Sequence, residues 1–347
     1  MANRVSMEDI AKKLGISKNT VSLVFRDMPG INEQTRKQIL DTATQMGYIY
    51  KNKSKQEAQN HLGPVEETPT MNICLCLPET TRESTGFFSH VLFGIEDEAK
   101  KNNFNTIIFY FDDEHGIKDI PLCIQNNMVS GIITLGRISC STVNTLLSFN
   151  LPLVMVDHYL EHIVTDCILS DNLSGAYKAV KYLVEKGHQK IGFLGDIEAS
   201  ISFYDRYMGY LKALKHYSLP ISEEHIIKTS YEKQGLKDFS LVVENLKEKT
   251  SFPSAFFCCN DIEAITLIKG LNSIGLKVPQ DISVIGFDDI DNARNFYPEL
   301  TTLRVEKEYM GKKAVQRLIH LLDFGPVTPE KLLLNVSIIE RQSVNGL

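Results

Sequence analysis

Residues 8–25 read EDIAKKLGISKNTVSLVF, and this stretch decides how the N-terminal part of the chain folds. Ser6 stands just before it, with Asp9 three residues on, which is the spacing of an approximate helix capping box. Three apolar side chains then recur on one helical face: Ile10, Ala11 and Leu14. Gly15 follows them, and glycine adopts the positive φ of a sharp turn at little cost. The pattern therefore predicts a short helix that ends in a tight turn.

Two further helices follow the turn. Ser17 is a favourable cap for the second helix, whose inward face is predicted to comprise Val21, Val24 and Phe25. Asn32 caps the third helix, whose buried side is predicted to comprise Ile39, Leu40, Ala43 and Met46. Two short helices around a glycine turn form the helix-turn-helix pattern, in which the second helix enters the major groove of DNA. A helical pair in a protein-interaction domain is the alternative interpretation.

The second helix and the segments around it carry side chains suited to duplex DNA. Asn pairs with adenine, Lys contacts guanine or phosphate, and Leu contacts the thymine methyl group. The candidate DNA-binding residues are Ser6, Ser17, Lys18, Asn19, Thr20, Ser22, Leu23, Arg26, Asn32 and Tyr48. The partner expected for this part of the chain is therefore double-stranded DNA.

Charge is distributed unevenly along the chain. The 347 residues carry a formal net charge of −6, but residues 1–55 hold ten Lys and Arg against five Asp and Glu. This segment is thus +5, which leaves −11 for the remainder. A basic module on an acidic body is the electrostatic footprint of a DNA-binding domain joined to a domain with another task.

From residue 72 onward, apolar runs alternate with amphipathic segments. The predicted strands span 73–78, 106–111, 131–136, 151–157, 167–172, 190–195, 254–260, 282–289, 300–305 and 331–340. The predicted helices include 90–101, 173–186, 203–216, 235–248, 261–274 and 307–322. Such alternation predicts βαβ units, in which parallel sheets are covered by helices on both faces. Because this is too many strands for one small sheet, we expect an α/β body of two subdomains.

Several predicted strands end in polar residues. The polar residues that follow apolar runs are Asp157, Asp171-Asn172, Asn260-Asp261 and Asp288-Asp289. Ligands of open α/β sheets bind beyond the carboxyl ends of the strands, so these residues predict a polar cleft. Carboxylate and amide groups suit a polyol, because each sugar hydroxyl both donates and accepts hydrogen bonds. The sequence therefore favours a sugar-like small molecule as ligand.

Signals of several other protein classes are missing from the sequence. The start of the chain has no apolar secretory segment, and no run approaches the 18 or so apolar residues of a membrane span. The seven cysteines include no CxxC motif. We expect reduced cysteines in a cytoplasmic protein that has no membrane partner, no metal and no cofactor.

We also expect no catalytic site. Asp288 and Asp289 are neighbours on a strand and point to opposite faces, so they do not converge on one atom. The sequence shows no nucleophile triad, P-loop or dinucleotide-binding glycine pattern. His158 and His162 have metal-like spacing but lie in a predicted loop, and His188 has no evident partner.

The sequence resembles the lactose-repressor (LacI) family of bacterial regulators. The head matches in VSMEDIAKKLGISKNTVSLVF and MPGINEQTRKQILDTATQMGY, and the body matches in LSDNLSGAYKAVKYLVEKGHQKIGFLG and AFFCCNDIEAITLIKGLNSIGLKVPQDISVIGFDDIDNA. The resemblance implies a helix-turn-helix domain at 1–50, a linker or hinge at 51–70, and an effector-binding and dimerisation domain at 71–347. That domain is similar to a periplasmic sugar-binding protein. Its implied parts are an N-subdomain of about 71–163 and 295–323 and a C-subdomain of about 164–294 and 324–347.

The resemblance also assigns residues to the cleft. The implied effector-binding residues are Asp157, Arg206, Asn260 and Asp288. On chemical grounds we add Phe87, which with Phe88 is predicted to supply an apolar wall. In the family, the arginine that Arg206 matches binds hydroxyl or carboxylate groups of the effector.

The linker departs from the family pattern. In the family this segment forms a hinge helix on DNA and inserts a leucine into the minor groove. Here Lys55 stands where alanine is usual, and the segment is several residues longer. Ala58 and Leu62 serving at shifted spacing is one interpretation, and a disordered tether is the other.

The resemblance implies a ligand-responsive transcriptional regulator, with repression as the expected output. Such a regulator binds a near-palindromic operator as a homodimer and answers to a sugar-like effector. A cytoplasmic sugar-binding protein without DNA function and a sugar-acting enzyme are the alternatives. The sequence leaves open whether the effector induces or co-represses.

Overall fold

The structure is a computed structural model of the chain, and it describes residues 6–25, 31–46, 71–82, 86–113, 120–229, 239–248, 251–325 and 327–347. The chain forms two compact units, Met1–Thr68 and Pro69–Leu347. The first is called the head and the second the body. The prediction of a hinge helix or tether at 51–70, with Ala58 and Leu62, lies outside the described residues.

The head contains three helices, α1 (Met7–Leu14), α2 (Lys18–Phe25) and α3 (Glu33–Gln45). The predicted capping box is present: the Ser6 N–H donates to Asp9 Oδ2 at 2.8 Å, and the Asp9 N–H donates to Ser6 Oγ at 3.4 Å. Hydrogen bonds donated to the Asp9 carboxylate by the Ser6 N–H and hydroxyl lower the pKa of Asp9. Gly15 ends α1 with φ of 67°, so the glycine turn also forms as predicted.

The core of the head consists of six buried apolar residues: Ile10, Ala11, Val21, Val24, Ile39 and Ala43. Met46 and Phe25 pack against this core and are partly buried. The prediction for Leu40 is wrong, because its side chain is 43% exposed. Ile39 and Ala43 are one turn apart and set the inward face of α3, and Leu40 lies about 100° further round the helix.

The body contains two six-stranded sheets. The first has the order β11-β5-β4-β3-β1-β2, and all its strands are parallel. Its strands are β1 (Met71–Pro78), β2 (Phe104–Phe111), β3 (Gly131–Leu135), β4 (Leu153–Val156), β5 (Asp166–Ser170) and β11 (Lys331–Leu334). The second has the order β12-β10-β9-β8-β6-β7, with β12 alone antiparallel. Its strands are β6 (Ile191–Leu194), β7 (Ile226–Ile227), β8 (Ala255–Cys258), β9 (Ser283–Asp288), β10 (Thr301–Arg304) and β12 (Ser337–Ile339).

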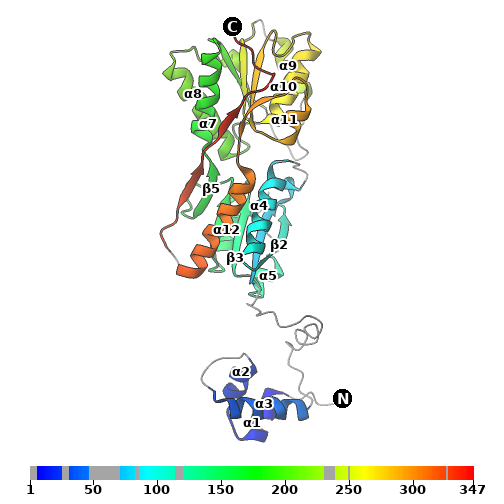
Figure 1. The fold of residues 1–347 in the computed structure, drawn as a ribbon, viewed down its shortest axis with the longest axis vertical. Helices are drawn as coiled ribbons and strands as arrows, with labels where there is room; N and C mark the ends of the chain where they lie inside the picture. The colour runs from blue at the N-terminus through cyan, green and yellow to red at the C-terminus, as the bar shows by residue number, and fades with distance from the viewer. Residues whose placement is uncertain are drawn as a thin grey trace. The chain divides into compact units, whose positions relative to one another are not determined.

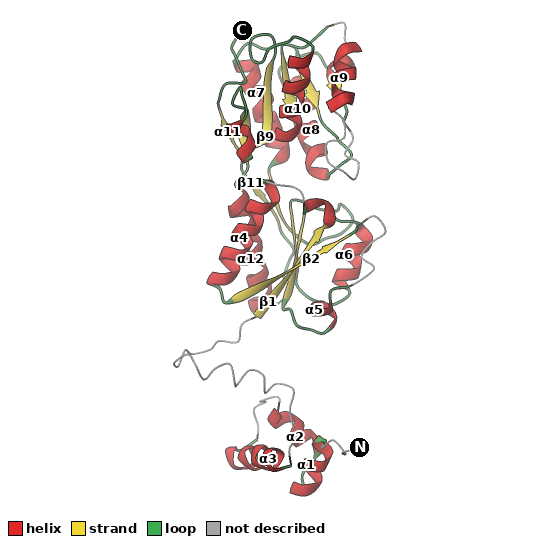
Figure 2. Cartoon of the chain, turned by 90° about the vertical axis from the view of Figure 1, so that its right-hand side faces the viewer, coloured by secondary structure: helices red, strands yellow, loops and turns green. Residues whose placement is uncertain are grey.

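Helices cover both faces of each sheet, as the alternating pattern predicts (Figures 1 and 2). The first sheet lies between α4 and α12 on one face and α5 and α6 on the other (Figure 2). The second lies between α7 and α8 on one face and α9 and α10 on the other. These helices and the short α11 span α4 (Phe87–Lys101), α5 (Leu122–Gln125), α6 (Cys140–Leu147), α7 (Asn172–Glu185), α8 (Ile201–His216), α9 (Phe239–Glu248), α10 (Asp261–Ser273), α11 (Asp291–Asn295) and α12 (Lys307–Phe324). We call the half around the first sheet the N-subdomain and the other half the C-subdomain.

The chain crosses between the subdomains three times: after β5, after β10 and after β11. These crossings differ from the predicted limits, because 166–170 and 331–334 are strands of the first sheet and 301–304 is a strand of the second. The single strand predicted at 331–340 is two strands. β11 pairs with β5 and β12 pairs with β10, so the dark red C-terminal segment of Figure 1 joins both sheets. An apolar run specifies a strand but not the sheet that receives it.

Helices α4 and α12 pack closely at a crossing formed by two glycines. A Cβ atom on Gly94 would lie 2.0 Å from the carbonyl oxygen of Glu308, and one on Gly311 would lie 2.2 Å from that of Val91. Both atoms are backbone, so they cannot move aside as the end of a flexible side chain can. The crossing therefore requires glycine on both helices.

We expect Gly94→Ala to destabilise the body by about 1–3 kcal/mol, because the added methyl group overpacks a backbone contact. Urea unfolding of the full chain measures this change as a lower midpoint. Glu96→Ala on the exposed side of the same helix is the control, with an expected change within about 0.5 kcal/mol. Equal effects of the two substitutions would show that the crossing tolerates a side chain.

All seven cysteines are free thiols, and five of them are buried. No helix in the described ranges combines the length and the apolar character needed to cross a membrane.

Candidate functional site

Polar residues meet where the carboxyl ends of the two sheets approach each other. Asp157 follows β4 of the N-subdomain, and Asp288 ends β9 of the C-subdomain. Both have left-handed backbones, with φ of 58° and 112°. Such conformations are costly for residues other than glycine and cluster at functional sites. The positions therefore mark this cleft as the candidate ligand site.

Arg206 on α8 is the buried centre of the cleft. Its side chain is 2% exposed, and Nη2 lies 3.0 Å from Asp288 Oδ1. Nε donates to Asn172 Oδ1 at 2.8 Å, and Nη1 donates to the Cys259 carbonyl oxygen at 2.6 Å. The guanidinium carbon also lies 3.8 Å from the centre of the Phe287 ring, a cation–π contact. The arginine thus joins α7, β8 and β9 beside the cleft.

Asp157 faces Arg206 and Asp288 from the opposite subdomain. Its carbonyl oxygen accepts a hydrogen bond from Ser202 Oγ on α8 at 3.3 Å. Its buried Oδ1 has no hydrogen-bond donor among the described residues. Burial raises the pKa of the Asp157 carboxyl to about 7; the Arg206 cation opposes this rise, and the nearby Asp288 carboxylate adds to it. Burial likewise raises the pKa of Asp288, against the lowering effect of Arg206 and Lys307.

Lys307 belongs to this site and was missed by the sequence reasoning, whereas Asn172 was recognised as a polar strand end but not assigned a role. Lys307 Nζ donates to the carbonyl oxygens of Asp288 and Asp289 at 2.6 and 2.9 Å. It stands at the start of α12, where no motif marks it. Asn172 follows the strand-end Asp171, and that polar strand end was the one available signal. Together the two residues hold the Arg206–Asp288 pair.

The adjacent Asp289 forms ion pairs with a different set of arginines. Its carboxylate binds Arg304 at 2.7 Å and also binds Arg341 and the more distant Arg294. Burial acts to raise the pKa of Asp289, but hydrogen bonds and charge from Arg341 and Arg304 outweigh it and hold that pKa below its ordinary value. The carboxylates of Asp288 and Asp289 therefore bind different cations, although Asp289 lies just beyond the end of β9 and not on the strand.

The remaining predicted cleft residues lie around this centre. Asn260 is buried and caps α10, where its Oδ1 accepts the Glu263 N–H at 2.8 Å. Phe87 is partly buried at the start of α4 and packs edge-on against Phe88, with ring centres 5.3 Å apart. Phe88 in turn lies against Gly136 at the end of β3. Asn260 thus lies between β8 and α10 and Phe87 at the start of α4, and their contact with an effector stays a prediction.

Two further carboxyl groups lie beneath the cleft on α10. Glu263 Oε1 accepts from Thr229 Oγ1, and Glu263 Oε2 accepts from the Cys259 thiol, both at 2.7 Å. Burial raises the pKa of Glu263 to about 7. Asp261 accepts from Thr302 Oγ1 and from the Ile290 N–H, and burial raises its pKa. The C-subdomain side of the site is thus rich in buried acids.

Contacts between the subdomains also surround the cleft. Arg137 Nη1 donates to the Ala199 carbonyl oxygen at 3.0 Å. On α4, the His90 ring atom Nε2 lies 3.4 Å from Oδ2 of Asp291 on α11. A change in how the subdomains meet would alter these contacts as well as the cleft.

Two of the histidines noted in the sequence, His158 and His188, are buried in the body. His158 is buried, and burial lowers its pKa to about 4. His188 does have partners, contrary to the sequence prediction: its ring nitrogens lie 2.9 Å from Ser254 Oγ and 3.0 Å from the Asn345 carbonyl oxygen. In the described part of the chain, no group of three or more His, Cys, Asp or Glu side chains is arranged to hold a metal ion.

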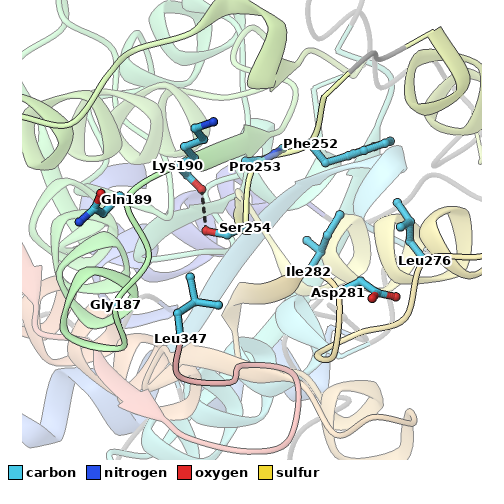
Figure 3. A pocket seen from close by; sticks show the side chains of 10 residues that line it. All are labelled: Gly187, Gln189, Lys190, Phe252, Pro253, Ser254, Leu276, Asp281, Ile282 and Leu347. Carbon is cyan, nitrogen blue, oxygen red and sulfur yellow. Dashed lines mark hydrogen bonds between the residues drawn. The ribbon is translucent and has the colours of Figure 1, made fainter.

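A cavity of about 400 Å³ lies elsewhere, at the amino ends of the strands of the second sheet (Figure 3). Its walls include Phe252, Leu276 and the C-terminal Leu347, and Ser254 donates to the Lys190 carbonyl oxygen at its floor. Ligands of such sheets bind at the carboxyl ends, where Asp157, Arg206 and Asp288 meet. The charged cleft is therefore the better candidate.

The head presents the predicted DNA-binding residues around α2. Ser17 caps this helix by accepting the Thr20 N–H at 3.1 Å, and Asn32 caps α3 by accepting the Thr35 N–H at 2.8 Å. Lys18 is exposed beside Glu8. Thr20 and Leu23 are partly exposed on α2, and Asn19 and Ser22 occupy positions in the same helix. Arg26 and Tyr48 lie outside the described residues.

Known proteins share both parts of this arrangement. Residues 6–50 match the bacterial regulatory proteins of the lacI family, and residues 180–344 match the periplasmic binding protein-like domain. The ribose operon repressor of Haemophilus influenzae is 28% identical over 344 residues, which covers 99% of either chain.

Solved structures agree with these matches. A LacI family transcriptional regulator from Enterococcus faecium, crystallised with bound ribose, is 27% identical with a TM-score of 0.68, covering 80% of this chain and 99% of that one. The lac repressor dimer bound to operator and the anti-inducer ONPF shares the fold at 22% identity, with a TM-score of 0.67 over 99% of this chain and 100% of that one. With a lacI-type head and a periplasmic-binding-protein-like body on one chain, the protein belongs to the LacI family of bacterial transcriptional regulators.

Proposed function

We propose that this protein is a transcriptional repressor whose binding to operator DNA is controlled by a small molecule in the cleft between its subdomains. The observation that carries the proposal is the union, on one chain, of a lacI-type head and a two-sheet body with a buried charged cleft. The relative from Haemophilus influenzae, which aligns over nearly the whole chain, is itself an operon repressor.

The head reads DNA through α2. Lys18, Asn19 and Ser22 contact base edges or phosphates in the major groove, and Leu23 contacts a thymine methyl group. Ser6, Ser17, Thr20 and Asn32 are placed at or near helix starts, where hydroxyl and amide groups reach phosphates. Arg26 and Tyr48 complete the proposed contact set.

The protein acts as a homodimer on a near-palindromic operator. In helix-turn-helix dimers the half-sites lie about 34–36 Å apart, or a multiple of that distance. The body supplies the dimer contacts, as the resemblance to the LacI family implies. The lac repressor, whose fold this chain shares, was itself solved as a dimer bound to operator.

The effector is sugar-like and binds at Phe87, Asp157, Asn260 and Asp288, beside Arg206. A regulator 27% identical to this chain binds ribose. The effector controls DNA binding only if it prefers one arrangement of the subdomains, because a ligand with equal affinity for two states shifts neither. Contacts such as Arg137 to Ala199 differ between those arrangements.

A regulator is favoured over a sugar-acting enzyme. The relatives are regulators, and Asp288 and Asp289 bind different partners instead of converging on one atom. As a regulator of bacterial genes, the protein works in the cytoplasm, where the chromosome lies.

Salt-dependent operator binding is the test of the proposed function. We expect the full chain to retard selected genomic fragments in a mobility-shift assay, with affinity falling steeply as salt rises because phosphate contacts release counterions. Lys18→Ala should weaken binding by about tenfold, the value of one good base or phosphate contact. Lys181→Ala on the exposed side of α7 is the control and should leave affinity unchanged. Failure of the chain to bind any fragment, with or without metabolites, would refute the proposal.

A further inference from the structure

Three thiols lie together on the face of the first sheet that α5 covers. Cys74 and Cys76 are two residues apart on β1, so their side chains point to the same face, and their Sγ atoms lie 3.7 Å apart. Cys123 belongs to α5, and its Sγ lies 3.8 Å from that of Cys74. Cys74 is therefore in sulfur–sulfur contact with two other thiols. We call these three residues the cysteine cluster.

The members of the cysteine cluster differ in exposure. Cys74 and Cys76 are fully buried, whereas Cys123 is partly exposed and follows Leu122, whose side chain is 70% exposed. A reagent in solution therefore reaches Cys123 first and finds Cys74 directly behind it. An accessible thiol with a second thiol within reach is the usual arrangement of cysteines that respond to oxidation.

The thiols outside the cysteine cluster lack this arrangement. Cys167 and Cys259 donate to oxygen atoms, the first to a backbone carbonyl group and the second to a carboxylate. Cys140 is exposed on α6. Among the residues that the structure describes, thiols contact thiols only within the cysteine cluster.

We propose that Cys123 and Cys74 form an oxidisable dithiol, which small-molecule disulfides such as oxidised glutathione convert to a disulfide between α5 and β1. The Cys123 thiol loses its proton and attacks one sulfur of the reagent RSSR, whose S–S bond breaks and releases one RSH. The Cys74 thiol then loses its proton and attacks Cys123 Sγ in the mixed disulfide, which releases the second RSH. The protein loses two electrons and two protons, and RSSR gains them.

Geometry selects Cys74 as the partner of Cys123. Their sulfurs must approach by about 1.8 Å to reach the disulfide bond length of about 2.05 Å. The shift falls to α5, which has only four residues, because β1 is held between β2 and β3. A bond between Cys74 and Cys76 would instead span two residues of extended strand, about 6.6 Å between Cα atoms, which is near the upper limit for a disulfide. The bond between Cys74 and Cys123 is therefore the favoured product.

Burial makes this dithiol slow to react and its disulfide stable. Burial and the nearby Cys74 raise the pKa of Cys123 to about 11, and the hydrogen bond with Cys76 and burial raise the pKa of Cys74. Because the thiolate is the attacking form, closure near neutral pH lies at the slow end of disulfide formation, which takes hours. Low-pKa thiolates stabilise the reduced state of strongly oxidising dithiols, and this dithiol has no such stabilisation.

Overnight incubation of the full chain with millimolar oxidised glutathione tests the site. Free thiols are then blocked with iodoacetamide, and the chain is digested without reduction and analysed by mass spectrometry. We expect Cys74 and Cys123 in one disulfide-linked peptide pair as the main internal disulfide. An unmodified Cys123, glutathione that stays on Cys123 without an internal bond, or a main bond between other cysteines overturns the inference.

Variants identify the two thiols that react. Cys123→Ser should abolish the internal bond, because it removes the accessible thiol. Cys140→Ser is the matched control, since it removes an exposed thiol outside the cysteine cluster and should leave the yield unchanged. Cys76→Ser should also keep the bond, and its loss in this variant would show that Cys76 is the partner of Cys123.

A comparison in urea shows whether the fold directs the bond, and it needs no substitution. In the unfolded chain the seven cysteines pair without native geometry, so the share of internal disulfides that joins Cys74 to Cys123 should fall by about fivefold or more. An equal share in urea and in buffer would show that the cysteine cluster does not direct the reaction.

Discussion

Arg206→Ala is expected to destabilise the body by about 3–5 kcal/mol, the usual cost of removing one member of a buried ion pair. Asp288 would lose the cation 3.0 Å away, and the oxygens of Asn172 and Cys259 would lose the Nε and Nη1 donors. Because Asp288 is buried, water cannot replace the lost cation. Urea unfolding and a thermal melt of the full chain both measure this change, and the effector response should disappear with it.

Arg294→Ala is the matched control for this experiment. Arg294 is 60% exposed and pairs with the neighbouring Asp289 at 3.6 Å, so its removal should cost less than about 1 kcal/mol. The double variant Arg206→Ala with Asp288→Asn tests the mechanism. Removing the uncompensated charge should recover part of the loss, which makes the two substitutions non-additive. If Arg206→Ala were as mild as Arg294→Ala, the arginine would not hold the site.

The positions of the cleft acids were predictable because they follow from local pattern and topology. Asp157 and Asp288 end apolar runs, and the carboxyl ends of parallel strands meet at one edge of a sheet. Helix starts were predictable for the same reason: Ser6 and Asn32 bind backbone groups three residues away, so the short-range sequence contains the whole interaction. The capping predictions at Ser6 and Asn32 agree with the structure, whereas the predicted burial of Leu40, which rested on helical periodicity, does not.

What the sequence could not supply is the choice among distant partners. The partners of Arg206 are 34 and 53 residues away in the chain, and no spacing rule links them. The run 331–340 is uniformly suitable for a strand, yet it divides between two sheets because β5 and β10 each accept one part. His188 shows the same limit, since Asn345 lies 157 residues further on. These contacts are set by how the chain crosses between subdomains, which apolar patterning does not encode.

The head is the part of the chain where a small change should have the largest effect on DNA binding. Its core rests on six buried side chains, and domains of this size bury little surface and are only marginally stable. Val21 is fully buried at the start of α2, where it contributes to that core. Loss of this one contact should therefore be felt by the helix that reads DNA.

We expect Val21→Asn to cost about 3 kcal/mol, combining the lost apolar burial with an amide that finds no partner in an apolar core. That is a large share of the stability of so small a domain, so the operator affinity of the full chain should fall by about tenfold or more. Fluorescence anisotropy with labelled operator DNA measures the loss. Calorimetric binding of a sugar by the body should remain, because Val21 lies in a separate unit.

Leu40→Asn is the control on α3: the side chain is 43% exposed, so the same polar group should cost less than about 1 kcal/mol. Equal losses from the two variants would place Leu40 in the core, as the sequence alone predicts, and would contradict the structure of the head.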